Sequence, residues 1–159
     1  MKKLIIGLGN PEIKYKNTRH NIGKLLVDYL KKTEIKNQFI LLKSSLFMNQ
    51  SGQFVKNIIK KYQISLENLY IAHDDLDIPL GKFKINFASG PKLHNGIKSI
   101  EETLETNNFW RIRIGVDNRN KENWIDGESY VLENFLPKEG EVLKTQVFPK
   151  IIQQLKLNK

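Results

Sequence analysis

Short apolar runs alternate with amphipathic segments along almost the whole chain. Runs that are continuously apolar, or that alternate strictly between apolar and polar residues, predict five strands, at residues 3–8, 38–42, 69–72, 82–87 and 110–116. Apolar residues that recur at helical spacing predict helices near residues 19–32, 54–62 and 97–104, and a last one after residue 142 that Pro149 must kink or split. Strands separated by helices indicate an α/β fold. We therefore expect a single domain over residues 1–159, with three α/β/α layers around a mixed, mostly parallel central sheet.

Two loops are candidates for a binding site because each follows a predicted strand. Residues 7–18 follow the first strand and residues 73–81 follow the third. In sheets of this kind, ligands bind in the crevice beyond the carboxyl ends of the strands. We therefore expect both loops to lie at the same edge of the sheet, with Thr18 as a cap of the first helix and Asn49 or Ser51 as a cap of the second.

The chain is strongly basic, with 26 Lys and Arg against 17 Asp and Glu and a formal net charge of +9. Such a surplus suits a polyanionic partner such as nucleic acid, although a Lys-rich composition that only solvates the surface explains it as well. The absence of cysteine excludes disulfides, thiolate zinc sites and cysteine nucleophiles, and it fits a cytoplasmic protein. No apolar run approaches the roughly 20 residues that span a bilayer. The N-terminal apolar run ends at Asn10 and Pro11, too early for a signal peptide.

His20 stands at the start of the first predicted helix. The partial positive charge of a helix N-terminus disfavours a protonated ring, so His20 is expected to stay neutral and is a candidate general base. The alternative is an exposed capping residue. The acidic run at residues 73–77 ends a predicted strand, and one of its carboxylates facing His20 would orient the ring. The same run also suits a hard cation held with His73, or a polar turn, but the metal-binding spacing HExxH is absent.

Amide and cationic side chains supply further candidate contacts. Asn49 and Asn95 stand near the starts of the second and third helices, where an amide can pair with the peptide groups of a substrate or simply cap the helix. The lysines of residues 82–87 share one face of their strand, and so do Arg111 and Arg113. If the two strands are neighbours, these cations form a basic strip that can follow a phosphate backbone; two ordinary solvated strand faces explain the alternation equally well.

Seven segments, taken together, resemble the bacterial peptidyl-tRNA hydrolase family. They are residues 7–11, Tyr15, and residues 18–23, 47–52, 73–79, 93–96 and 111–115. Their order and most of their spacing agree with the family over residues 3–116. The resemblance implies an enzyme of translation that hydrolyses the ester between peptide and tRNA in peptidyl-tRNA and so recycles the tRNA.

The resemblance also implies roles for particular residues. His20 matches the catalytic base, Asp74 the acid that stabilises it, and Asn10 the residue that helps to distinguish N-blocked from free aminoacyl-tRNA. The residues that match contacts to the peptidyl-tRNA end are Tyr15, Phe47, Asn49 and Asn95. The basic residues that match contacts to the tRNA backbone are Lys84 and Arg113. The resemblance further implies a monomer that needs no metal and no organic cofactor and has no membrane partner.

The chain departs from the family pattern in several places. The stretch between His20 and Asn49 is shorter than is typical of the family, which predicts a missing strand or hairpin. Pro91, Lys92 and Leu93 replace small residues and are expected to narrow or reshape the peptide site. Residues 116–119 replace a Gly-Arg-Pro-like turn, and the lid segment and the C-terminal helix are shorter.

Two other functions stay open from the sequence. A non-catalytic RNA-binding relative would keep the fold and the basic face; the altered residues 90–93 favour this alternative, and the presence of both His20 and Asp74 opposes it. A metal-dependent hydrolase would use His73 and the neighbouring carboxylates. A chelator would abolish the activity of the second alternative only.

Overall fold

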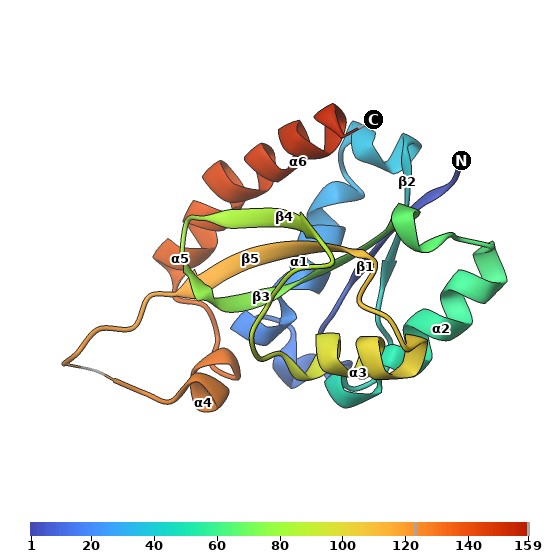
Figure 1. Cartoon of the computed structure of the whole chain (residues 1–159). Coiled ribbons are helices and arrows are strands. Elements are labelled where there is room, and N and C mark those ends of the chain that lie inside the picture. The colour runs from blue at the N-terminus through green and yellow to red at the C-terminus, as the bar shows by residue number, and fades with distance from the viewer. Residues whose placement is uncertain (123, 159) are drawn as a thin grey trace.

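A twisted five-stranded sheet forms the central layer of the computed structural model, which describes residues 1–122 and 124–158 (Figure 1). The strands are β1 (Lys3–Gly7), β2 (Phe39–Lys43), β3 (Leu69–Pro79), β4 (Phe83–Phe87) and β5 (Trp110–Asp117). Their order across the sheet is β2-β1-β3-β5-β4. Neighbouring strands are parallel except β4, which runs antiparallel to β5. The expected α/β fold with a mixed, mostly parallel sheet is confirmed.

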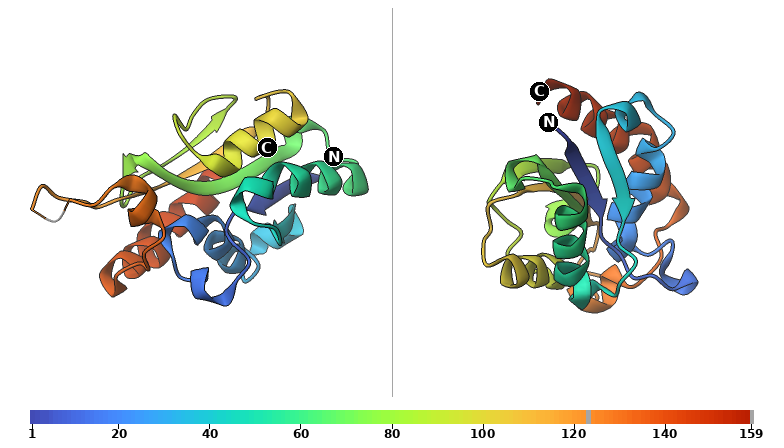
Figure 2. Two further views of the ribbon diagram at one scale, coloured as in Figure 1. Left: turned by 90° about the horizontal axis from the view of Figure 1, so that it is seen from below. Right: turned by 90° about the vertical axis from the view of Figure 1, so that its right-hand side faces the viewer.

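Helices cover both faces of this sheet and complete the three layers (Figure 2). They are α1 (Ile22–Leu30), α2 (Ser51–Tyr62), α3 (Asn95–Leu104), α4 (Gly127–Val131), α5 (Pro137–Val142) and α6 (Phe148–Leu157). The core on one face includes Leu26 of α1 and Ile151 of α6. The core on the other face includes Val55 of α2 and Ile100 of α3. Each helix thus removes its apolar stripe from water against the sheet, which is the main driving force for this arrangement.

Short 3₁₀ turns connect the larger elements. They are η1 (Ile13–Tyr15), η2 (Arg19–Asn21), η3 (Glu34–Asn37), η4 (Met48–Gln50) and η5 (Leu66–Asn68). Between α1 and β2, where every residue is described, the chain forms only η3 and no strand. That a strand or hairpin of the family pattern is missing between His20 and Asn49 stays a prediction. Within the described part of the chain, no helix is both long and apolar enough to cross a bilayer.

The first two helices begin without the predicted caps. The hydroxyl of Thr18 donates to the carbonyl of Tyr15 and does not accept from a helix N–H. Ser51 is the first residue of α2, its hydroxyl donates to the carbonyl of Met48, and Asn49 lies one turn earlier in η4. The 3₁₀ turn η2 replaces the first turn of the first predicted helix, and η4 directly precedes α2; they carry His20 and Asn49.

The third strand is longer than the sequence predicts. β3 continues through the acidic residues 73–77 to Pro79. β5 pairs with it in parallel as far as Asp75 and again at Pro79, with an irregularity between these two points. The expected loop 73–81 is therefore mostly strand, because its backbone groups find partners in the neighbouring strand that the sequence pattern does not reveal.

Pro149 lies in the first turn of α6. α5 continues into a π-helical turn, η6 (Leu143–Val147), which continues into α6. A proline has no N–H to bond to the preceding turn, and π-helical turns are one way in which a helix accommodates such an interruption. The predicted kink or break thus takes the form of a local change of helical pitch.

Two glycines let α1 lie directly on the sheet. A Cβ atom on Gly23 would lie 2.1 Å from the carbonyl oxygen of Ala72 in β3, and one on Gly7 would lie 2.2 Å from the carbonyl oxygen of Gly23. Only a residue without a side chain permits such an approach of two backbones. This contact holds the start of α1, which follows His20, against the part of β3 that carries Asp74.

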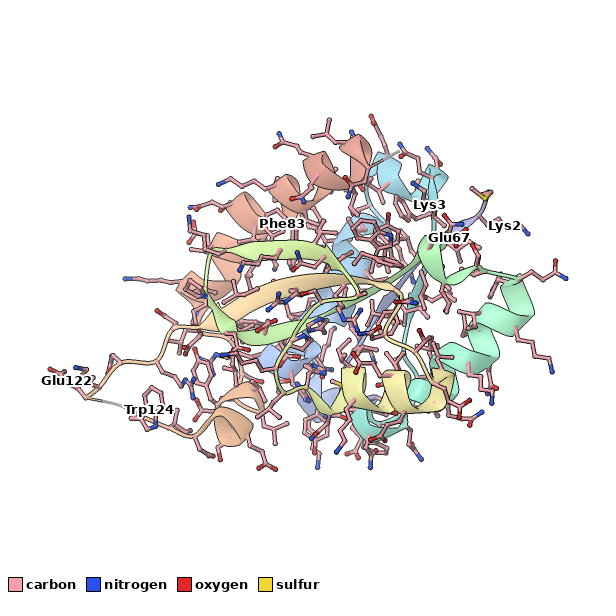
Figure 3. The ribbon with its side chains drawn as sticks, viewed as in Figure 1. Lys2, Lys3, Glu67, Phe83, Glu122 and Trp124 are labelled. Atoms are coloured by element: carbon pink, nitrogen blue, oxygen red, sulfur yellow. The ribbon has the colours of Figure 1, made fainter. Side chains whose placement is uncertain are left out.

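Residues 118–122 and 124–126, between β5 and α4, extend away from the body of the molecule (Figure 1). Figure 3 shows Glu122 and Trp124 near the end of this extension. Trp124 is 66% exposed, and the guanidinium of Arg119 lies 4.4 Å from the centre of its ring. After the extension the chain returns to form α4 beside the N-terminal end of α3, close to the carboxyl ends of the parallel strands (Figure 1).

Candidate active site

Asp74 lies between two histidines near the carboxyl end of the parallel part of β3. Its Oδ2 is 2.9 Å from Nδ1 of His20, and its Oδ1 is 2.8 Å from Nε2 of His94. The side chains of Asp74 and His94 are almost fully buried, whereas that of His20 keeps 13% of its surface exposed. Burial alone would raise the pKa of Asp74, but the charges and hydrogen bonds of the two histidines outweigh burial and lower that pKa. Asp74 is therefore an ionised carboxylate, which only accepts hydrogen bonds.

The N-terminus of α3 fixes the tautomer of His94. The backbone N–H groups of Gly96 and Ile97 both donate to Nδ1 of His94, at 3.1 and 3.2 Å. Nδ1 therefore presents a lone pair, and the ring hydrogen is on Nε2, which donates it to Asp74. His94 thus caps α3 and holds one oxygen of the carboxylate while the other oxygen faces His20.

His20 has one ring nitrogen engaged and one free. Because Asp74 only accepts, Nδ1 of His20 is the donor, and Nε2 carries the lone pair when the ring is neutral. Nε2 has no hydrogen-bond partner among the described residues, and His20 lines the main cavity of the molecule. A ring held in this way can take a proton from a substrate or a water in the cavity.

The pKa of His20 differs in direction from the sequence-based expectation. Burial of the ring lowers this pKa, but the charge and the hydrogen bond of Asp74 raise it by more, so the pKa lies above that of a free histidine. The expected influence of the helix N-terminus, which lowers this pKa, is outweighed, because a carboxylate at hydrogen-bond distance has a larger effect than the partial charge of a helix end.

His73 is fully buried and takes no part in this pair of hydrogen bonds. Its Nδ1 donates to the carbonyl of Asp74 at 2.8 Å, and its Nε2 has no partner among the residues described. Burial, followed by the charge of His94, lowers the pKa of His73 to about 3. The ring is therefore neutral near pH 7, and it does not point a proton-accepting group into the cavity.

A metal ion would find its candidate ligands at His20, Asp74 and His94, and not at His73. The ligand atoms of these three side chains lie within 4.8 Å of one another. Nε2 of His94, however, carries the hydrogen that it donates to Asp74, so it offers no lone pair to a metal while α3 is capped as described. The donor set fits a hydrogen-bonded triad better than a metal centre.

Asn21 holds the backbone of Asn10, and Met48 orients its side-chain amide. The backbone N–H of Asn10 donates to Oδ1 of Asn21, and Nδ2 of Asn21 donates to the carbonyl of Asn10, both at 2.9 Å. The side-chain oxygen of Asn10 accepts from the backbone N–H of Met48 at 3.0 Å. The amide nitrogen of Asn10 is therefore the end that remains to donate to a molecule in the cavity that Asn10 lines.

One cavity of about 950 Å³ joins these groups. His20, Asp74 and His94 line it together with segments from η4, β3 and α4 and the loop before α3. The other predicted site residues that line it are Asn10, Phe47, Asn49 and Asn95. The prediction that residues 7–18 and 73–81 would meet at one edge of the sheet is confirmed, because Asn10 and Asp74 line the same cavity.

Three predicted site residues lie outside this cavity. Tyr15 is half-buried in η1 and does not line it. Lys84 and Arg113 are directly opposite each other on β4 and β5. Lys84 is exposed, whereas the guanidinium of Arg113 donates to Asp75 at 2.8 Å and to Asn86 at 3.0 Å.

The predicted basic strip forms only in part. β4 and β5 are neighbours, as the strip requires. Arg111, however, is 1% exposed, and its guanidinium pairs with Glu101 of α3 and with the carbonyl of Phe109. Arg111 is therefore a buried structural cation, and the exposed charges of the strip are those of Lys82 and Lys84.

A family model described as peptidyl-tRNA hydrolase matches residues 4–158. The chain belongs to the peptidyl-tRNA hydrolase family. It is 36% identical to the peptidyl-tRNA hydrolase of Aquifex aeolicus over 171 residues, which cover 96% of this chain and 88% of that protein. It is 39% identical to the peptidyl-tRNA hydrolase of Clostridium botulinum strain Alaska E43 over 162 residues, which cover 91% and 83% of the two chains.

The fold agrees with a solved structure of the peptidyl-tRNA hydrolase family. The crystal structure of the enzyme from Acinetobacter baumannii superimposes with a TM-score of 0.74 at 32% identity, over 89% of this chain and 81% of that one. Membership of the family confirms the expectation that this chain is an enzyme of the hydrolase class.

Sequence reasoning missed two residues of the site in this member of the peptidyl-tRNA hydrolase family. His94 holds Asp74, and Asn21 holds Asn10. Both stand inside segments that carried the family resemblance, residues 93–96 and 18–23. That position was the available signal, but neither spacing nor residue type reveals a contact across the fold.

Proposed function

We propose that this chain hydrolyses the ester bond between the peptide and the terminal ribose of peptidyl-tRNA, with His20 as the general base and Asp74 as its stabilising partner. The observation that carries the proposal is the 2.9 Å hydrogen bond between His20 and a carboxylate that His94 holds from the other side. This bond orients the ring and stabilises its protonated form during the reaction. Membership of the peptidyl-tRNA hydrolase family supports the choice of substrate.

The reaction needs one proton acceptor and a place for one negative charge. A water molecule attacks the ester carbonyl while Nε2 of His20 takes its proton. The tetrahedral intermediate carries an oxyanion, for which the amide of Asn95 in the cavity lining supplies an N–H donor. When the bond to the ribose oxygen breaks, that oxygen takes the proton from Nε2. The products are a peptide with a free carboxyl group and tRNA with a free terminal hydroxyl.

The direct test compares one tRNA charged with N-acetyl-leucine and with free leucine. The Nδ2 group of Asn10 is a donor, and it can pair with the acetyl carbonyl of the blocked substrate but not with the ammonium of the free one, which is also a donor. We expect the blocked substrate to be hydrolysed faster by about tenfold or more, as measured by release of uncharged tRNA. Equal rates for the two substrates contradict the proposal.

Two added measurements separate the other candidate functions. If the chain binds tRNA but releases no product from either substrate, it is a non-catalytic RNA-binding relative. If a chelator abolishes hydrolysis, a metal ion is required and the His94 tautomer described above is wrong. We expect hydrolysis to be unchanged by chelator, because the proposed step uses only His20 and a water molecule.

The pH dependence of kcat/KM is expected to report the His20–Asp74 pair. Only the neutral ring accepts a proton, so kcat/KM should rise with pH through the pKa of His20. Because Asp74 raises that pKa, the acid limb should lie above the pH of about 6.5 at which a free histidine titrates. Asp74→Asn removes the carboxylate but leaves the ring buried, so the limb is expected to move to lower pH while the maximal rate falls.

The matched control for this profile is Asp77→Asn, which removes an exposed carboxylate of the same acidic run. Its pH profile is expected to equal that of the native chain. An acid limb that stays in place in Asp74→Asn contradicts the coupling between Asp74 and His20.

Lys84 is expected to contribute to tRNA affinity through the phosphate backbone only. Lys84→Ala should weaken tRNA binding and reduce the slope of log Kd against log salt concentration by about one, with kcat unchanged because Lys84 lies outside the cavity. Lys150→Ala, on α6 at the opposite face of the sheet, is the control and should leave the slope unchanged. Titrations at several salt concentrations check this, and equal slopes for all three proteins rule out the contact.

A further inference from the structure

The cavity that contains His20 has a charge opposite to that of the whole chain. The protein carries a net charge of +9, yet no Lys or Arg is among the residues that line the cavity in the described part of the chain. Its acidic groups are Asp74 and Glu128. Phosphate groups bind where cations or free backbone N–H groups gather, so the lining suits the peptide end of the substrate and not the tRNA backbone.

Three large apolar side chains are exposed in the lining of the same cavity. Phe47 is 42% exposed, Leu93 is 94% exposed and Leu132 is 44% exposed. They come from three separate segments: the residue before η4, the loop between β4 and α3, and the end of α4. In the free protein they leave apolar surface in contact with water, and a ligand that covers them gains the free energy of removing that surface from water.

Leu93 places this apolar surface close to the reacting atoms. It directly precedes His94, whose ring centre lies 5.2 Å from that of His20. The proton that His20 accepts comes from a water next to the ester carbonyl, and Leu93 lines the same cavity as His20. The substituent nearest to that carbonyl is the side chain of the amino acid that forms the ester.

We propose that Phe47, Leu93 and Leu132 form an apolar subsite for the side chain of the ester-linked amino acid, so that this chain prefers apolar residues to acidic ones at that position. The inference rests on the proposed function and names the part of its substrate that the cavity selects. Covering an apolar side chain favours binding of the reacting complex. Glu128 on α4 and Asp74 oppose the entry of a carboxylate, because like charges in a partly enclosed site repel.

The experiment uses one tRNA charged in turn with N-acetyl-leucine, N-acetyl-aspartate and N-acetyl-glycine, so that only the side chain differs. We expect kcat/KM to be higher for the leucine ester than for the aspartate ester by about tenfold or more. Leu93→Ser should lower kcat/KM for the leucine ester by about three- to tenfold and leave the glycine ester unchanged. Because Leu93 is 94% exposed, this substitution removes no packing from the core.

The matched control is Leu157→Ser, which replaces an 81% exposed leucine near the end of α6, outside the cavity lining. It should leave the three rates unchanged. Equal kcat/KM for the leucine and aspartate esters overturns the subsite. If Leu93→Ser slows all three esters equally, the apolar surface covers the terminal nucleoside of the tRNA, which also overturns it. Absence of hydrolysis for all three esters in the native chain overturns the proposed function and the subsite with it.

Discussion

Replacing His20 by Ala is expected to lower kcat for N-acetyl-aminoacyl-tRNA by about 10²- to 10⁴-fold, the usual contribution of a positioned general base. Nε2 of His20 is the proton acceptor that the geometry leaves free in the cavity. Nε2 of His94 carries the hydrogen that it donates to Asp74, and His73 is buried with a pKa of about 3. KM should change little, because the groups proposed to hold the substrate lie on other residues. Release of uncharged tRNA at saturating substrate measures the effect.

A loss of activity in His20→Ala has to be separated from a loss of structure. Removing the ring leaves Asp74 with its bond to His94, so we expect the thermal unfolding curve to stay cooperative. Asp77→Asn, an exposed change in the same acidic run, controls for a general sensitivity of this edge of the sheet. If His20→Ala keeps more than about a tenth of the native kcat, His20 is not the general base of the native chain.

The meeting of His20 and Asp74 could be predicted because it follows from chain order. His20 follows β1, and Asp74 lies near the carboxyl end of the parallel part of the neighbouring strand β3; the carboxyl ends of such strands meet at one edge. The strands themselves were recognisable from their apolar runs. The length of β3 was not, because residues 73–77 are polar and their place in the sheet depends on β5, which follows about 35 residues later in the chain.

The residues that sequence reasoning misplaced share one property: a partner distant in the chain decides their state. Arg111 stands at a polar position of an alternating strand, where an exposed side chain is expected, but it is buried in an ion pair with Glu101 of α3. His94 caps α3 through Nδ1, and its Nε2 also donates to Asp74, a contact that the sequence does not reveal. The pKa of His20 rises because Asp74 lies 2.9 Å away. Periodicity carries no information on such pairings.

The second large effect concerns the stability of the fold and comes from a buried ion pair next to the active site. Arg19 directly precedes His20, and its side chain is only 4% exposed. Its Nη2 donates to Glu139 of α5 at 2.8 Å, and its Nη1 donates to the carbonyl of Tyr130 in α4 at 3.1 Å and to Glu133 at 3.3 Å. The guanidinium also lies 3.9 Å from the ring centre of Tyr130. This buried cation joins the turn that carries His20 to the C-terminal helices.

Glu139→Gln is expected to destabilise the fold by about 3–5 kcal/mol, the usual cost of removing one partner of a buried ion pair. The Glu139 side chain is 3% exposed and also accepts from the backbone N–H of Leu136 and the amide of Asn118. Glutamine keeps the shape but leaves the charge of Arg19 without its buried counter-ion. Such a loss is a large part of the 5–15 kcal/mol that stabilises a typical domain. Urea unfolding of the native chain and the variant measures it.

The same arginine supplies a matched control for this prediction. Glu133 pairs with Arg19 at 3.3 Å, but its side chain is 54% exposed, so Glu133→Gln should cost no more than about 1 kcal/mol. Each variant removes one carboxylate partner of Arg19, and the two carboxylates differ in burial. Equal losses of stability for Glu139→Gln and Glu133→Gln would show that burial does not set the strength of these pairs. The link between the His20 turn and α5 would then contribute no more than an ordinary surface ion pair.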